Sequence, residues 1–267
     1  MKRIATTTAL ITALSATSVA ADTVIHFKTN APGSPERMAI HGSKVMILAP
    51  ERQGRLVMDT ASGTVTMIND RDKSYFQLDS RTIDQTVSMM DMMKQTMMAQ
   101  LERLPPEQRK MLEQQLGLTP ALPEKLPKVE IRPTRSVIKV NGIPCTLTDV
   151  ITDGQKTAEA CVAKPGAAGI PDSDYRTMQK MFRLSRELAK KTSRMTGPAA
   201  EKFAESLSPD LDGFPMEVKD LRNNNHVIVS KIESKTLAGS QFRPGKGYKQ
   251  FNPMQEMQRL MGQRERQ

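Results

Sequence analysis

The most constraining feature of this sequence is a series of short apolar segments, separated by tight turns, between residues 23 and 80. Ser62-Gly63 and Asn69-Asp70 are among the turn signals. The predicted strands are 24–27, 37–42, 44–48, 55–59, 64–68 and 74–78. Short strands at close, regular spacing are typical of an antiparallel meander. The N-terminal part therefore predicts a β-sheet in which successive strands pair.

The period of the apolar residues then changes, which predicts a first helical insert over about 82–117. Positions at alternating steps of four and three form an apolar stripe that Lys94 interrupts: Ile83, Val87, Met90, Lys94, Met97, Leu101 and Leu104. Pro105-Pro106 ends this helix, and a second one follows to Gly117. The proline-bearing stretch 118–128 predicts an extended linker.

The second half of the chain repeats the alternation of strands and helix. Strand signals return at 129–131, 136–140, 146–151, 157–163, 213–218 and 227–232, around a second helical insert over about 172–207. Asp172 or Asp174 can cap that insert. The sequence thus predicts an α+β fold with one antiparallel sheet. A single domain would cover 22–250, its inserts would lie on one face, and 251–267 would form a polar, basic tail.

The N-terminus has the three parts of a secretory signal. Lys2 and Arg3 precede an uncharged stretch, and small residues end at Ala21. The stretch is too short and too rich in threonine for a membrane span. We therefore expect residues 1–21 to be cleaved and the protein to be periplasmic, with neither a lipid anchor nor a transmembrane segment.

The two cysteines, Cys145 and Cys161, occupy matching places in a predicted hairpin. A three-residue loop, 152–154, would pair Ile151 with Gln155 and place the cysteines directly opposite each other. Opposite residues have Cα separations that a disulfide accepts, and an exported protein can form one. A structural disulfide is favoured over a redox-active pair, because the sequence has no C-x-x-C spacing.

The sequence carries no enzyme signature. There is no G-x-S-x-G elbow, Walker loop or G-x-G-x-x-G motif. His26, His41 and His226 are isolated from one another and from any set of acidic ligands. We therefore expect no catalytic residues, no cofactor and no enzymatic activity.

The net charge of +10 bears on partners. Lys and Arg are scattered and are not interleaved with aromatic residues, which argues against nucleic acid. An anionic membrane surface or an acidic partner fits an exported protein better. The favoured alternative is that the charge simply maintains solubility.

Methionines crowd the first insert at positions 89, 90, 92, 93, 97 and 98. Met89, Met93 and Met97 recur at steps of four, so three thioethers could bind Cu(I). Flexible, apolar methionine also suits packing or an adaptable surface, and we favour that interpretation. A third interpretation, intermediate between these two, is that the methionines line a groove for a lipid-like ligand or a partner helix. Its contacts would be Val87, Met90, Met93, Met97 and Leu101.

Several motifs together resemble the DUF4412 family of exported bacterial proteins of unknown function. They are Val65–Asp70 with Lys73–Leu78, the Met-rich helix with Leu104–Gln108, Asn141–Cys145, Gly213–Met216 and Phe242–Tyr248. The chain departs from the family at Cys161, where many members carry an aromatic residue. The resemblance implies the fold of periplasmic lipoprotein carriers, a curved antiparallel half-barrel with helices on its concave side. It implies no activity, because a fold does not fix function.

These features predict a non-enzymatic, periplasmic binding or chaperone-like protein. Its ligand would be a lipid, an acyl chain or an apolar peptide held on the concave face. The alternative is a periplasmic Cu(I)-binding protein that uses the Met-rich helix. The sequence leaves the oligomeric state open.

Overall fold

The computed structural model describes residues 21–30, 34–49, 54–102, 104–105, 108, 128–196 and 211–251. These residues form one sheet of twelve strands. The strands are β1 (Asp22–Thr29), β2 (Arg37–His41), β3 (Lys44–Ala49), β4 (Gly54–Asp59), β5 (Thr64–Asn69), β6 (Ser74–Leu78), β7 (Val129–Val140), β8 (Ile143–Thr152), β9 (Gln155–Ala163), β10 (Phe214–Asp220), β11 (Asn225–Lys235) and β12 (Lys249–Gln250). The helices are α1 (Ser80–Leu101) and α3 (Asp172–Thr196), with short 3₁₀ turns at Pro165–Ala168 and Gly239–Phe242.

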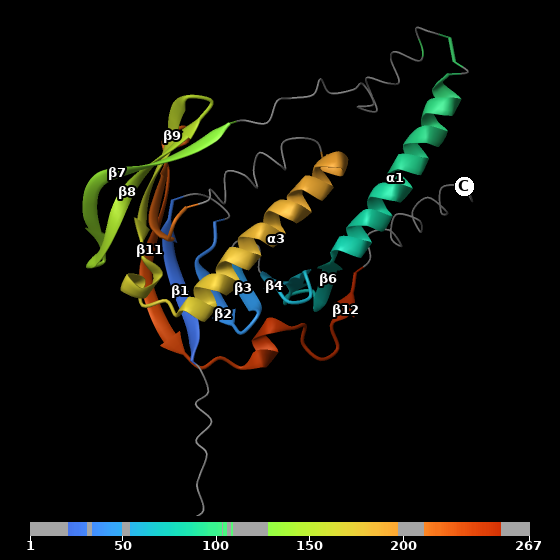
Figure 1. Ribbon diagram of the computed structural model, residues 1–267. Helices are drawn as coiled ribbons and strands as arrows, with labels where there is room; N and C mark the ends of the chain where they lie inside the picture. Colours follow the sequence, from blue (N-terminus) through green and yellow to red (C-terminus); the bar gives the residue numbers. More distant parts are fainter. Residues whose placement is uncertain are drawn as a thin grey trace, which may run out of the picture.

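The strand order places the N-terminal strand inside the sheet. From one edge to the other the order is β12-β6-β5-β4-β3-β2-β1-β11-β10-β9-β8-β7. Strand β1 pairs antiparallel with both β2 and β11, and so joins the two halves of the chain. All pairs are antiparallel except β12 with β6. The prediction of a single, mostly antiparallel sheet is confirmed (Figure 1).

The β8–β9 hairpin differs in register from the prediction. Asp153 and Gly154 both have positive φ, 52° and 83°, which gives a two-residue turn that pairs Thr152 with Gln155. A β-bulge follows, between Val150 and Ile151. The predicted three-residue loop is therefore wrong, because the turn is one residue shorter and the bulge shifts the pairing further.

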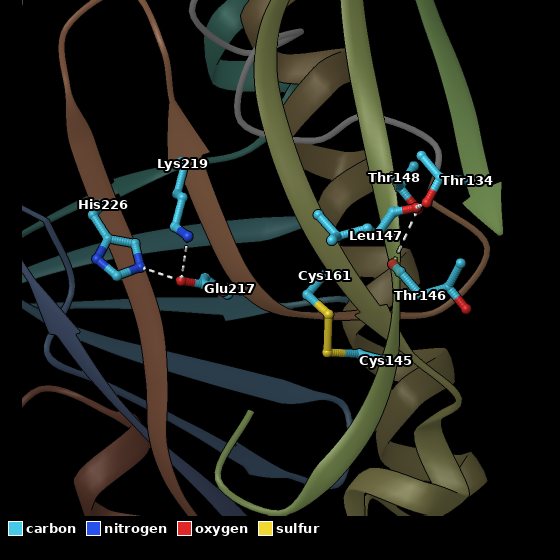
Figure 2. The surroundings of a disulfide bond; sticks show 9 residues. All are labelled: Thr134, Cys145, Thr146, Leu147, Thr148, Cys161, Glu217, Lys219 and His226. Atoms are coloured by element: carbon cyan, nitrogen blue, oxygen red, sulfur yellow. Dashed lines mark hydrogen bonds and ion pairs between the residues drawn. A yellow bond between two sulfur atoms is a disulfide. The ribbon is translucent and has the colours of Figure 1, made fainter. Parts of the chain in front are cut away.

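Strand β7 is one continuous strand where the sequence predicted two. Its pairing with β8 is interrupted between Pro133 and Val137, where proline offers no N–H to the ladder. The Thr134 hydroxyl donates across the gap to the carbonyl of Leu147 at 2.8 Å (Figure 2). The two predicted segments are thus the regular parts on either side of an irregularity.

Both helices begin close to their predicted positions. Asp79 caps α1 by accepting a hydrogen bond from the Thr82 N–H at 2.7 Å, which lowers the pKa of Asp79. Helix α3 begins at Asp172, as predicted. Among these residues, no helix is long and apolar enough to cross a membrane. Five predictions lie outside the described residues: the signal at 1–21, except Ala21, the two helix segments at 109–117 and 198–207, the linker before residue 128, and the tail after Phe251.

Apolar side chains cover both faces of the sheet. On the face here called the inner face, Met178 and Met181 of α3 pack with Ile25, Ile40 and Val45. The opposite, outer face carries Val24, Ala39, Met46, Val57 and Ile68, which pack with Phe242 from the C-terminal segment. One helix therefore covers part of the inner face, and one C-terminal segment covers part of the outer face.

The outer segment, residues 237–250, is fastened by polar contacts. The Tyr248 hydroxyl donates to Asp70 at 2.7 Å, which raises the pKa of Tyr248 because its anion would face a carboxylate. Arg55 pairs with Asp70 at 3.1 Å, and Asp22 accepts from the Leu237 N–H at 2.7 Å. The Phe242–Tyr248 motif thus has a structural role in this chain.

Candidate functional site

Helix α3 crosses the inner face near one end of the strands. The Thr177 hydroxyl donates to the carbonyl of Gly42, in the β2–β3 turn, at 3.0 Å. Further along the helix, the Ser185 hydroxyl contacts the sulfur of Met58 at 3.6 Å. Beneath the helix lies a transverse apolar row, fixed by strand register: Ile40, Val45, Met58, Val65 and Leu78. The first four of these are buried.

A second apolar row lies beside the first on the inner face, two residues away from it on each strand. We call it the inner row: Met38, Ile47, Leu56, Met67 and Phe76. The exposed fraction is lowest at Met38, at 7%, and highest at Met67, at 44%. Ile47, Leu56 and Phe76 are half-buried. The inner row is therefore apolar surface that α3 leaves open, and it is the strongest candidate binding site among the described residues.

The predicted ligand helix, α1, contacts α3. Lys191 of α3 pairs with Asp84 of α1 at 2.9 Å, so the two helices are in contact (Figure 1). Of the predicted ligand contacts, Val87 is half-buried and Leu101 is buried. The side chains of Met90, Met93 and Met97 lie outside the described part of the chain.

The accessible side of α1 carries methionine. Met89 is 42% exposed and Met92 is 61% exposed. Both line an open groove of about 830 Å³ along the helix, which starts at Ser80. The groove is lined by α1 side chains, so it is an extended helix surface rather than an enclosed cavity. Met89 of the predicted copper set is accessible, whereas the side chains of Met93 and Met97 lie outside the described part of the chain.

Each histidine is paired with a carboxylate. His41 lies 2.8 Å from Asp22, and His226 lies 2.7 Å from Glu217, which also binds Lys219 (Figure 2). His26 lies 3.0 Å from Glu233. Among the described residues, no three His, Cys, Asp or Glu side chains are grouped so as to hold a metal ion.

The Glu233 pair gives the fold a pH-dependent contribution. Hydrogen bonds from Lys231 and then from His26 lower the pKa of Glu233 from 4.5 to about 2. This contribution is fully present above pH 4.5 and is lost as the pH falls towards 2. We expect Glu233→Gln to lower stability at neutral pH and to match the wild type near pH 2. Urea unfolding over this pH range is the measurement, and a constant difference between the two proteins would contradict the prediction.

The disulfide forms between the predicted cysteines. Cys145 and Cys161 are bonded, with their Cα atoms 5.3 Å apart (Figure 2). Leu147, not Cys145, is the direct partner of Cys161 in the ladder, so the bond runs diagonally between β8 and β9. Both cysteines are only 2% exposed and belong to the core. The bond is therefore structural and shielded from external thiols.

The inner row was not predicted, although the sequence carries a partial signal for it. Val65 and Met67 alternate with polar residues, as do Phe76 and Leu78. Alternation marks two faces, but it does not tell which face a distant helix covers. The predicted ligand contacts therefore lay on the methionine-rich helix and not on the sheet.

Comparisons with known proteins leave the family open. No protein-family model and no curated protein matches this sequence. A solved structure of PNGF-II matches with a TM-score of 0.38 and 8% identity; the match covers 90% of this chain and 32% of PNGF-II. An uncharacterized conserved protein from Thermus thermophilus matches with a TM-score of 0.40 and 8% identity, over 87% of this chain and 91% of the other. Such low scores carry no argument, and the DUF4412 resemblance stays a prediction.

Proposed function

We propose that this chain is a non-enzymatic, periplasmic binding or chaperone-like protein that holds a lipid, an acyl chain or an apolar peptide against the inner row. The exposure of the inner row, which reaches 44% at Met67, is the observation that carries the proposal. A ligand that covers the row would remove apolar surface from water, and each Å² buried would favour binding by about 25 cal/mol. Methionine and leucine in the row suit ligands of varied shape.

The arrangement of the helices supports the same function. We propose that the sheet is a DUF4412-like half-barrel with the inner face as its concave side, part of which α3 fills. In Figure 1, α3 lies along the sheet and α1 extends beyond it. Half-buried Phe182, Leu184 and Leu188 pack on the core from α3. An apolar chain in the inner row would thus meet sheet side chains below and helix side chains beside it.

A carboxylate placed in the inner row tests the proposal. We expect Met67→Asp to weaken binding of a fluorescent fatty acid by about tenfold or more, because an unpaired charge would be buried by the ligand. Gln77→Asp is the matched control, since exposed Gln77 lies on the neighbouring strand at an outer-face position. Fluorescence titration gives the affinities, and thermal unfolding verifies that both variants fold.

Three outcomes would contradict this function. They are absence of probe binding to the wild type, equal loss in both variants, and native mass spectra in which protein from the periplasm is always empty. The copper alternative is tested alongside by Met89/Met93/Met97→Leu. This triple variant preserves apolarity, so we expect unchanged probe binding and Cu(I) titrations no different from the weak binding of the wild type.

A further inference from the structure

The exposed side of α3 carries a row of positive charge. Arg176, Lys180 and Arg183 recur at steps of four and three, so they share one side of the helix, and all three are exposed. We call these three residues the cationic stripe. The opposite side holds Met178 and Met181, at 1% and 2% exposure. Packing against the sheet therefore fixes the direction in which the stripe points.

The three side chains of the stripe form no ion pair with other described residues. Other surface cations have carboxylate partners there: Lys156 lies 2.8 Å from Asp149, and Lys191 of α3 itself pairs with Asp84. Within the described residues, no such pair involves the three stripe residues. Asp172 precedes and Glu187 follows the stripe by four residues on the same side of the helix, so its three cations exceed the two carboxylates there by one charge.

The stripe and the inner row face the same side of the molecule. Helix α3 packs on the inner face, so its exposed side points away from the sheet in the direction that the inner row also faces. A surface that contacts the stripe would therefore lie over the open part of the inner row. A ligand could pass between that surface and the row without crossing the sheet.

We propose that the cationic stripe docks the protein on an anionic lipid bilayer, from which the inner row takes up its ligand or to which it returns it. This inference rests on the proposed function, because it supplies the source of an apolar ligand. Charge complementarity selects the bilayer: cations near a lipid surface bind anionic headgroups, and the apolar ligand class occurs in the same bilayer. Nucleic-acid stacking would require exposed aromatic residues, whereas Gln179 is the exposed residue between the stripe positions.

Vesicle sedimentation tests the docking. We expect the wild type to bind vesicles that contain phosphatidylglycerol and not vesicles of phosphatidylcholine alone, with binding weakened by added salt. Arg176→Gln, Lys180→Gln and Arg183→Gln together should weaken the binding about a hundredfold. The matched control neutralises Lys28, Lys246 and Lys249, which are exposed away from α3 and give the same change in net charge.

The outcomes separate docking from ligand binding. Equal loss in both triple variants, no preference for anionic vesicles, or stripe-dependent binding of DNA without binding of vesicles would overturn the docking. The stripe variant should still bind the soluble fatty acid probe, which lacks a bilayer. If no protein binds the probe while the stripe still controls vesicle binding, the proposed function fails and the docking stands.

Discussion

Replacing Met178 by alanine is expected to lower the free energy of unfolding by about 2 to 5 kcal/mol, the range for truncating a large core side chain. Met178 is 1% exposed and lies in the core cluster that joins α3 to the sheet. Truncation removes apolar contacts and leaves a cavity between the helix and the inner face. Urea unfolding followed by circular dichroism measures the loss.

Two further methionine variants show whether burial causes this loss. Met178→Leu keeps the volume and should cost less than about 1.5 kcal/mol. Met92→Ala removes the same atoms from a helix side chain that is 61% exposed, and we expect a change within about 0.5 kcal/mol. Similar losses for Met178→Ala and Met92→Ala would mean that α3 does not hold the inner face as described.

The strands could be predicted because their signals are local. In β5 and β6, Thr64–Asn69 and Ser74–Leu78, turn residues bound each apolar segment, so the strand limits follow from the sequence within a residue. The same pattern on both sides of the helical inserts predicted that the strands belong to one sheet. The β8–β9 register failed by one residue at the turn, and the bulge added to the error, because turn type and bulges depend on backbone dihedrals that the residues only bias.

The candidate site could not be predicted, because it depends on long-range packing. The residues around Met67 do not indicate that α3, which begins more than a hundred residues later in the sequence, covers Val65 and leaves Met67 exposed. Likewise, Arg176, Lys180 and Arg183 belong to charges that look scattered along the chain, and only the helix brings them together on one side. The C-terminal segment is a third case, since Tyr248 meets Asp70 only after the sheet has formed.

Reduction of the Cys145–Cys161 bond is expected to lower the free energy of unfolding by about 3 kcal/mol, because the bond closes a loop that the unfolded chain cannot then open. The two cysteines are 16 residues apart, and the chain-entropy model gives this figure for a loop of that size. The loss is smaller if the β8–β9 hairpin persists in the unfolded chain. The comparison is between the oxidised protein and the same protein reduced in denaturant, where the core no longer shields the bond, and refolded with reductant present; both side chains then stay in place.

Two controls relate this loss to the bond itself. Cys145→Ala/Cys161→Ala should be insensitive to the reductant, and it should be less stable than the oxidised wild type by at least the loop contribution, because both cysteines are buried. Mass mapping without reduction should find the two residues linked in protein purified without a reductant. Free thiols there, or equal stability with and without reductant, would contradict the prediction.

The bond ties β8 to β9 diagonally, so its loss should loosen these strands before β2–β5, where the register is fixed by pairing alone. Hydrogen exchange resolved by residue would show that order, and uniform loosening would instead indicate that the bond acts only on the unfolded chain.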